Sequence, residues 1–189
     1  MNQPSQTAQR AGRFKLLLIM AVFAAPMLAA GLLTLSGWQP AGKAYGQPVT
    51  PQRNFAQENL RVVLDDGQAW AWRAEQPQLT LVALPGPGCA KQCLDGLTKI
   101  AAARITLNRN APRLRLLYVG EPPADAERDG MKNYWRIGSD VEGRLAAWRP
   151  SAPDRVSALL VESNGTALAY YPVDFDPTGL RKDLQKVIR

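Results

Sequence analysis

Residues 79–97 read LTLVALPGPGCAKQCLDGL, and the order of features along them points to an α/β fold. The run from Leu79 to Leu84 is almost entirely apolar, which is typical of a central strand that is buried on both faces of a sheet. A turn rich in proline and glycine follows, and we expect a helix to open at Cys89. Cys93 then lies one helical turn further on, on the same face of that helix.

The sequence contains two cysteines, and both lie at this junction of strand and helix. Free backbone N–H groups and the helix dipole stabilise a thiolate at a helix N-terminus. We therefore expect Cys89 to be the exposed, attacking thiol and Cys93 the resolving thiol, with Lys91 between them favouring the thiolate form. A dithiol in this place suits thiol–disulfide exchange or the binding of soft Cu(I), which accepts two thiolate ligands.

A structural disulfide is the alternative interpretation of the cysteine pair, because exported proteins often use a disulfide as a staple. A bridge that closes so short a loop constrains the unfolded chain little, which favours chemistry over a purely structural role. The bridge requires Cα atoms within about 7 Å of each other. We expect a loosened first helical turn, with Gly86 and Gly88 supplying the freedom.

Histidine is absent from the sequence. This excludes Ser-His-Asp hydrolysis, Cys-His proteolysis and metal sites that depend on imidazole. The formal net charge is +7, but the basic residues are scattered and are not interleaved with aromatic residues. A solvated surface is therefore expected, and binding of nucleic acid is not.

Residues 16–38 carry no charged side chain and are mostly apolar. About 20 such residues span the hydrocarbon core of a membrane as a helix. Arg10, Arg13 and Lys15 come directly before them, so the positive-inside rule places residues 1–15 in the cytoplasm. A cleaved signal peptide is the alternative, but its apolar region usually has about 7–15 residues. We expect a retained, single-pass anchor.

Residues 39–57 are rich in Gly, Pro, Gln and Ala and are predicted to form a linker. The domain proper is predicted at residues 58–189. A strand at 113–119 completes a βαβ unit and puts the cysteines at the carboxyl end of its first strand, where open α/β sheets place their chemistry. The other predicted elements are a strand at 68–73, a helix opening with the capping box at 139–142, a strand at 157–161, a hairpin turn at Asn164-Gly165 and a last helix from Asp176-Pro177.

With this order of elements, the chain resembles the thioredoxin superfamily, and within it the Sco/SenC-type cytochrome c oxidase assembly proteins. The resemblance rests on the C-x-x-x-C spacing after a strand and turn, on ADAERDGMKNY at 124–134, and on the ending from ALLVESNGTALAYY at 158–171 to DPTGLRKDL at 176–184. It implies an α/β fold with a thioredoxin-like mixed sheet flanked by helices, preceded by one N-terminal transmembrane helix.

The chain departs from the Sco pattern at the third copper ligand. Members of that group hold copper with the two cysteines and a histidine shortly before the first strand of the hairpin. Asp154 or Arg155 occupies that place here, so the resemblance extends to the fold and the pathway, and a three-ligand site of the Sco type is not expected. Thioredoxins also place a cis-proline beside their cysteines, and Pro153 is the nearest candidate for it.

The resemblance implies an inner-membrane protein with its N-terminus in the cytoplasm and its domain in the periplasm. It would act in the assembly of a respiratory complex, cytochrome c oxidase, through Cys89 and Cys93, by thiol–disulfide exchange or transient Cu(I) handling. The partners implied are the membrane and a respiratory oxidase subunit or assembly factor. The alternative is a non-catalytic docking factor that uses the same fold to bind a membrane partner.

Overall fold

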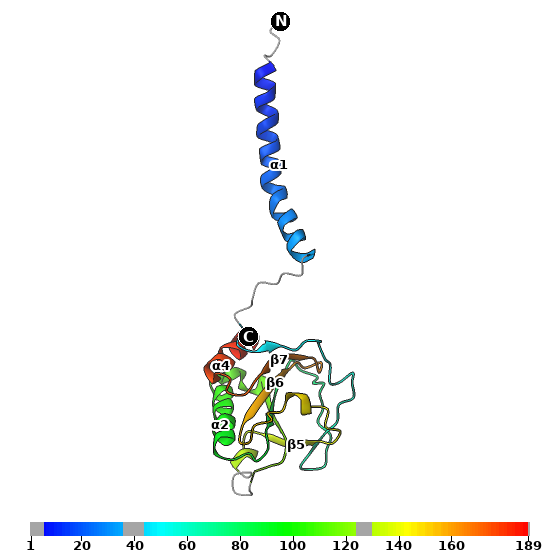
Figure 1. Ribbon diagram of the computed structural model, residues 1–189, viewed down its shortest axis with the longest axis vertical. Helices are drawn as coiled ribbons and strands as arrows, with labels where there is room; N and C mark the ends of the chain where they lie inside the picture. The colour runs from blue at the N-terminus through cyan, green and yellow to red at the C-terminus, as the bar shows by residue number, and fades with distance from the viewer. Residues whose placement is uncertain (1–5, 36–43, 124–129, 189) are drawn as a thin grey trace. The chain divides into compact units, whose positions relative to one another are not determined.

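The computed structural model of the chain has two compact units, Met1–Lys43 and Ala44–Arg189 (Figure 1). The residues that it describes are 6–35, 44–123 and 130–188. Three groups of predicted positions therefore lie outside the described residues. They are residues 1–5 of the cytoplasmic segment, the end of the apolar span with the first part of the linker (36–43), and the first part of the motif at 124–134.

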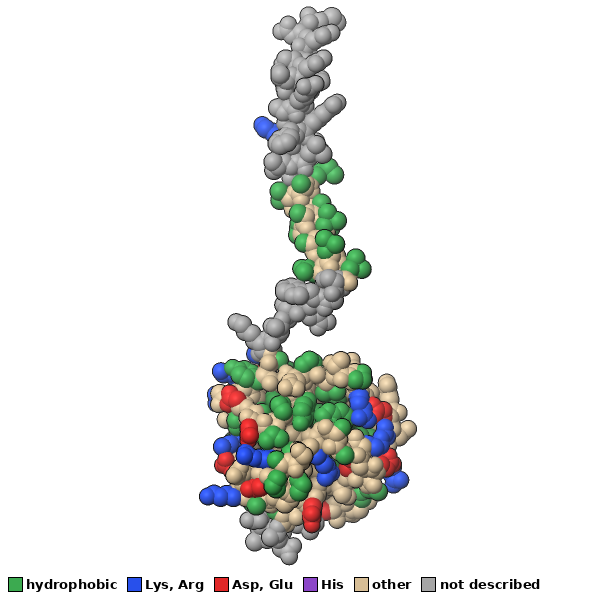
Figure 2. Space-filling view, in the orientation of Figure 1, with side chains coloured by type: hydrophobic (Ala, Val, Ile, Leu, Met, Phe, Trp, Pro, Cys, Tyr) green, Lys and Arg blue, Asp and Glu red, His purple; other side chains and the backbone are tan. Residues whose placement is uncertain are grey.

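The first unit contains one helix, α1 (Gln6–Leu35), with Pro26 inside it. Large apolar side chains such as Phe23 and Met27 are exposed on this helix, at 74% and 80% (green in Figure 2). Within the described ranges, no helix has both the length and the mean hydropathy that it would need to span a membrane.

The second unit is built on a seven-stranded sheet with the order β1-β7-β6-β3-β4-β5-β2. β3 runs parallel to β4 and antiparallel to β6, so the sheet is mixed, as predicted. β3 is the middle strand and all of its residues are buried, which matches its apolar run. The strands are β1 (Gln47–Pro48), β2 (Val62–Leu64), β3 (Leu79–Pro85), β4 (Leu114–Val119), β5 (Arg136–Asp140), β6 (Val156–Val161) and β7 (Ala167–Tyr171).

Two helices, α2 (Lys91–Ile105) and α4 (Pro177–Val187), pack together against one face of the sheet (Figure 1). The opposite face is covered by the segment before β3 and by the short 3-10 helix η2 (Ala146–Trp148). A second 3-10 turn, η1 (Asn108–Arg113), joins α2 to β4. The side chains of β3 alternate between the two cores, because successive residues of a strand face opposite sides.

Residues 44–57, predicted as part of the linker, are instead packed into the domain. β1 pairs with β7, and Phe55 is fully buried. The carboxylate of Asp183 on α4 accepts hydrogen bonds from the backbone N–H groups of Tyr45 at 2.7 Å and Gly46 at 3.0 Å. A two-residue edge strand and a distant carboxylate leave no periodic pattern in a sequence, which explains the wrong boundary.

Two smaller predictions are also wrong. The helix predicted to open at Ser139 is the end of β5 followed by a turn, because the side chain of Asp140 accepts a hydrogen bond from the backbone N–H of Leu145 at 2.7 Å. The strand predicted at 68–73 is reduced to a single bridge from Ala69 to β2. The predicted β6–β7 hairpin and the last helix are confirmed.

Candidate functional site

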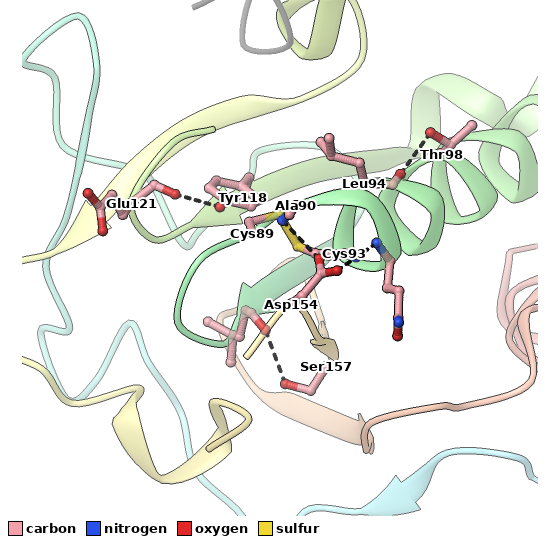
Figure 3. Close-up of a disulfide and its surroundings, with 11 residues drawn as sticks. Cys89, Ala90, Cys93, Leu94, Thr98, Tyr118, Glu121, Asp154 and Ser157 are labelled. Carbon is pink, nitrogen blue, oxygen red and sulfur yellow. Dashed lines mark hydrogen bonds between the residues drawn. A yellow bond between two sulfur atoms is a disulfide. The ribbon is translucent and has the colours of Figure 1, made fainter. Parts of the chain in front are cut away.

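The two cysteines form a disulfide that joins the turn after β3 to the first turn of α2 (Figure 3). Their Cα atoms are 5.2 Å apart, inside the limit of about 7 Å for a bridge. The helix begins at Lys91, after Ala90 as its N-cap residue, so Cys89 lies just outside it. This start, two residues later than predicted, explains how cysteines four residues apart are bridged.

The two cysteines differ in exposure. Cys93 is fully buried in the core beneath α2, whereas Cys89 is half-buried. A protein thiol that approaches from solvent therefore reaches Cys89 first. This is the arrangement that exchange chemistry needs, with one sulfur open to attack and a second sulfur held behind it.

The N-terminus of α2 is capped by Asp154, which comes from the loop before β6. Its carboxylate accepts hydrogen bonds from the backbone N–H groups of Ala90 at 2.8 Å, Gln92 at 3.0 Å and Cys93 at 3.0 Å (Figure 3). These bonds lower the pKa of Asp154, and the bond from Cys93 has the largest effect. The carboxyl group is therefore charged at neutral pH. The carboxylate thus occupies N–H groups that would otherwise stabilise a Cys89 thiolate.

The loop that carries Asp154 is joined to the turn before the cysteines by two backbone hydrogen bonds. Gly86 donates to the carbonyl of Arg155 at 2.8 Å, and Asp154 donates to the carbonyl of Pro87 at 3.0 Å. Asp154 adopts the left-handed conformation, with φ of 54°. Aspartate tolerates this conformation better than most residues, which helps to hold its carboxylate at the helix end.

Gly86 is required where the two loops meet, because a Cβ there would lie 2.3 Å from the backbone oxygen of Ala152. We expect Gly86→Ala to lower the free energy of unfolding by about 1–3 kcal/mol, since backbone has to move to make room. Denaturant unfolding of the oxidised full chain measures this. The control is Gly130→Ala, where no heavy atom lies within 4 Å of the added Cβ. Equal stability of the two variants would show that the loops are not in close contact.

A groove of about 640 Å³ lies beside Cys89. Its walls come from the turn between β3 and α2, from Pro122 and Pro123 after β4, and from residues 149–151 near η2. A volume in this range is typical of ligand sites. A segment of another protein therefore has room to approach the half-buried sulfur.

The two residues predicted to modulate the cysteines lie at the edges of the site. Lys91 is exposed at the first position of α2 and lines a different groove from Cys89. The cis-proline predicted at Pro153 is wrong, because the cis peptide bond in the described residues is that between Thr50 and Pro51. Pro153 is exposed, and the turn of this loop toward α2 is made by the left-handed Asp154.

The site does not fit a three-ligand copper centre. The described residues contain no group of three His, Cys, Asp or Glu side chains that could hold a metal, and the sequence has no histidine. Asp154 stands near the place expected for the missing histidine, but its two oxygens accept three backbone hydrogen bonds. After reduction, the donors that the site offers to a soft metal are the two cysteine sulfurs.

Two family models match the chain. One is described as a transmembrane-like, thioredoxin-like, C-terminal domain and matches residues 79–189, more than half of the chain. The chain belongs to this family. The second model, a transmembrane-like, N-terminal domain, matches residues 6–36 and so coincides with α1. No curated protein matches the chain.

Three solved structures that resemble the chain have identities of 13–16%. Copper-bound ScoI of Arabidopsis thaliana has a TM-score of 0.52 at 16% identity and covers 77% of this chain and 99% of its own. The thioredoxin domain of a thiol-disulfide oxidoreductase from Bacteroides vulgatus has a TM-score of 0.49 at 14% identity and covers 76% of this chain and 98% of its own. BsSco, a member of the Sco family of cytochrome c oxidase assembly proteins, has a TM-score of 0.49 at 13% identity and covers 75% of this chain and 96% of its own. At such identities, the ScoI likeness shows the fold alone.

The feature of the site that the sequence did not reveal is the cap on α2. The sequence drew attention to Asp154 only as the occupant of a missing ligand's place. Its hydrogen-bond partners lie 61 to 64 residues away in the chain, so no local pattern connects them. One signal was present: Ala90 cannot cap a helix with its side chain, which indicates that the cap comes from elsewhere.

Proposed function

We propose that this chain carries out thiol–disulfide exchange with a partner protein through Cys89 and Cys93. The observation that carries the proposal is the disulfide itself, with half-buried Cys89 beside a groove and Cys93 buried behind it. A bridge that closes so short a loop stabilises a fold less than one that closes a long loop, which favours a chemical role over a purely structural one.

The exchange proceeds in two displacements. A thiolate of the partner attacks Sγ of Cys89, a bond forms between the two proteins, and Cys93 leaves as a thiolate. A second partner thiolate then attacks the partner sulfur of the mixed disulfide and releases Cys89 as a thiolate. The partner loses two electrons and gains a disulfide, while the Cys89–Cys93 pair is reduced. The reverse sequence, started by a Cys89 thiolate, reduces a partner disulfide.

We further propose that residues 1–15 stay in the cytoplasm, residues 16–38 cross the inner membrane, and the domain acts in the periplasm. The transmembrane-like family match over α1 and the exposed apolar side chains of that helix support an anchor. The partner proposed is a respiratory oxidase subunit or an assembly factor of cytochrome c oxidase, on the basis of the Sco/SenC resemblance of the sequence.

Transient Cu(I) handling by the reduced dithiol is the second part of the proposal, because two thiolates suit this soft ion. We expect the reduced full chain in detergent to take one Cu(I) from a colorimetric chelator and the variant with both cysteines changed to serine to take none. If the wild type removes no more Cu(I) than the double variant, copper handling is refuted while exchange still stands.

In cells, the same double variant should be made at the normal level and should leave cytochrome c oxidase activity in the membranes near background. The measurement is oxidase activity together with the amount of the variant chain. Normal oxidase activity with an intact protein level would contradict a chemical role for the cysteines. It would favour the alternative of a non-catalytic docking factor.

A further inference from the structure

A notch in the sheet lies beside the first part of β4, at the end of the domain opposite the disulfide. β4 pairs with β3 from Leu114 to Tyr118, but it pairs with β5 only from Leu117 onward. In the described chain, no strand covers the first part of β4 on that side. A cavity of about 330 Å³ lies there, and the side chains of Arg104, Arg115 and Arg136 all line it. We call this cavity the arginine notch.

Two of these arginines are held in place by bonds to neutral groups. Nε of Arg104 on α2 donates to the carbonyl of Leu114 at 2.7 Å. Nη2 of Arg115 donates to Oγ1 of Thr80 at 2.9 Å, and its guanidinium stacks 4.5 Å from the ring centre of Trp70. These bonds position the cations and leave their charge unbalanced.

Donors remain without acceptors at the same place. Within the described part of the chain, Nε of Arg115 and Nε1 of Trp70 are buried and have no hydrogen-bond partner. The ion pairs found among the described residues involve neither Arg104 nor Arg115. Burial also lowers the pKa of Arg115. Arg104 and Arg115 are half-buried and lie among neutral acceptors, so an anion in the notch would pair with guanidinium charge that no described carboxylate balances.

The third arginine is free to change partners. Arg136 donates to Asp66 at 2.7 Å, and their side chains are 53% and 42% exposed. An exposed ion pair of this kind contributes little to stability. Arg136 can therefore leave Asp66 for an anion in the notch at small cost.

We propose that the arginine notch binds a small organic anion whose carboxylate or phosphate group contacts the three guanidinium groups. Guanidinium forms paired, charge-assisted hydrogen bonds to such oxyanions. The walls of the notch include Leu64, Trp70 and Tyr134, so the rest of the ligand is apolar. This site is separate from the cysteines and does not depend on the proposed exchange reaction.

The test is calorimetric titration of the full chain in a non-ionic detergent. Phenyl phosphate is expected to bind saturably, with one site per chain, and more tightly than inorganic phosphate because of the apolar walls. Dihexanoyl-phosphatidylglycerol, compared with dihexanoyl-phosphatidylcholine, distinguishes a lipid headgroup from a free anion. Saturable binding of either anionic probe supports the site and identifies its source, and binding of neither refutes it.

Variants decide whether any binding belongs to the notch. Arg104→Gln and Arg136→Gln are each expected to weaken binding about tenfold, the effect of one lost charge-assisted contact. The matched control is Arg109→Gln, an exposed arginine on η1 that does not line the notch. Circular dichroism verifies that each variant is folded. An equal loss in the control, or no loss in the two notch variants, would overturn the proposal.

Discussion

Replacing Cys89 by serine is expected to reduce thiol–disulfide exchange by a factor on the order of 10² or more, to the uncatalysed rate. Cys89 is the half-buried sulfur beside the groove, and the sulfur of Cys93 is fully buried. The measurement is the turnover of a fluorescent peptide disulfide by the full chain in detergent, with a fixed concentration of reductant.

Cys93→Ser is the matched variant, because it removes the same bridge but keeps the accessible sulfur. It should form a stable mixed disulfide with the peptide through Cys89, which mass spectrometry detects. Loss of the bridge costs about 2 kcal/mol for a loop this short, so both variants should remain folded. If the Cys89 variant retained turnover, or if the peptide were trapped on Cys93, the assigned roles would be reversed.

Replacing Asp154 is expected to make the disulfide easier to reduce. Its carboxylate holds three N–H groups at the start of α2 and places a negative charge beside the cysteines. Both effects disfavour a thiolate there and so favour the oxidised pair. Asp154→Asn should raise the reduction potential by roughly 30 mV, the equivalent of a tenfold change in the equilibrium constant of a two-electron couple. Asp154→Ala should raise it further by freeing the N–H groups.

The control for Asp154→Asn is Asp176→Asn. Asp176 caps α4 in the same way, accepting from the N–H groups of Thr178 and Gly179, but it does not contact either cysteine. Its replacement should leave the potential unchanged. A shift of equal size in both variants would mean that helix capping in general, and not the charge beside the disulfide, sets the potential.

The pH dependence of the cap follows from its lowered pKa. Because folding lowers the pKa of Asp154, the contribution of the charged cap is complete above the ordinary aspartate value of about 3.9. It is lost only as the pH falls through the lowered value. The difference in potential between wild type and Asp154→Asn should therefore persist at neutral pH, and it should disappear in acid.

Much of this fold can be predicted from local patterns in the sequence. The apolar run of β3, the turn and the start of α2 were predicted within two residues, because burial and turn chemistry act over short stretches. The last helix was predicted equally well, because Asp176 caps it and Pro177 occupies its first turn. The position of the cysteines could be predicted for the same reason, since they lie in the turn after β3 and at the start of α2.

What the sequence did not show depends on contacts between distant segments. Asp183 binds the backbone at Tyr45 and Gly46 and so draws the supposed linker into the domain. Asp154 caps α2 although it lies 61 residues from Cys93 in the sequence. The arginine notch exists because β5 pairs with only part of β4. None of these contacts repeats with a helical or strand period. They are set by packing, which a single sequence does not display.

The most direct measurement is the redox equilibrium of the full chain in detergent against dithiothreitol and glutathione buffers, with the Cys89–Cys93 state read by thiol alkylation and mass spectrometry. Structural disulfides commonly have potentials below about −300 mV, whereas exchanging pairs lie above it. Thiol–disulfide exchange predicts a reversible two-electron transition above that value. A pair that stays oxidised below it, or that cannot be reoxidised, would contradict the proposed function.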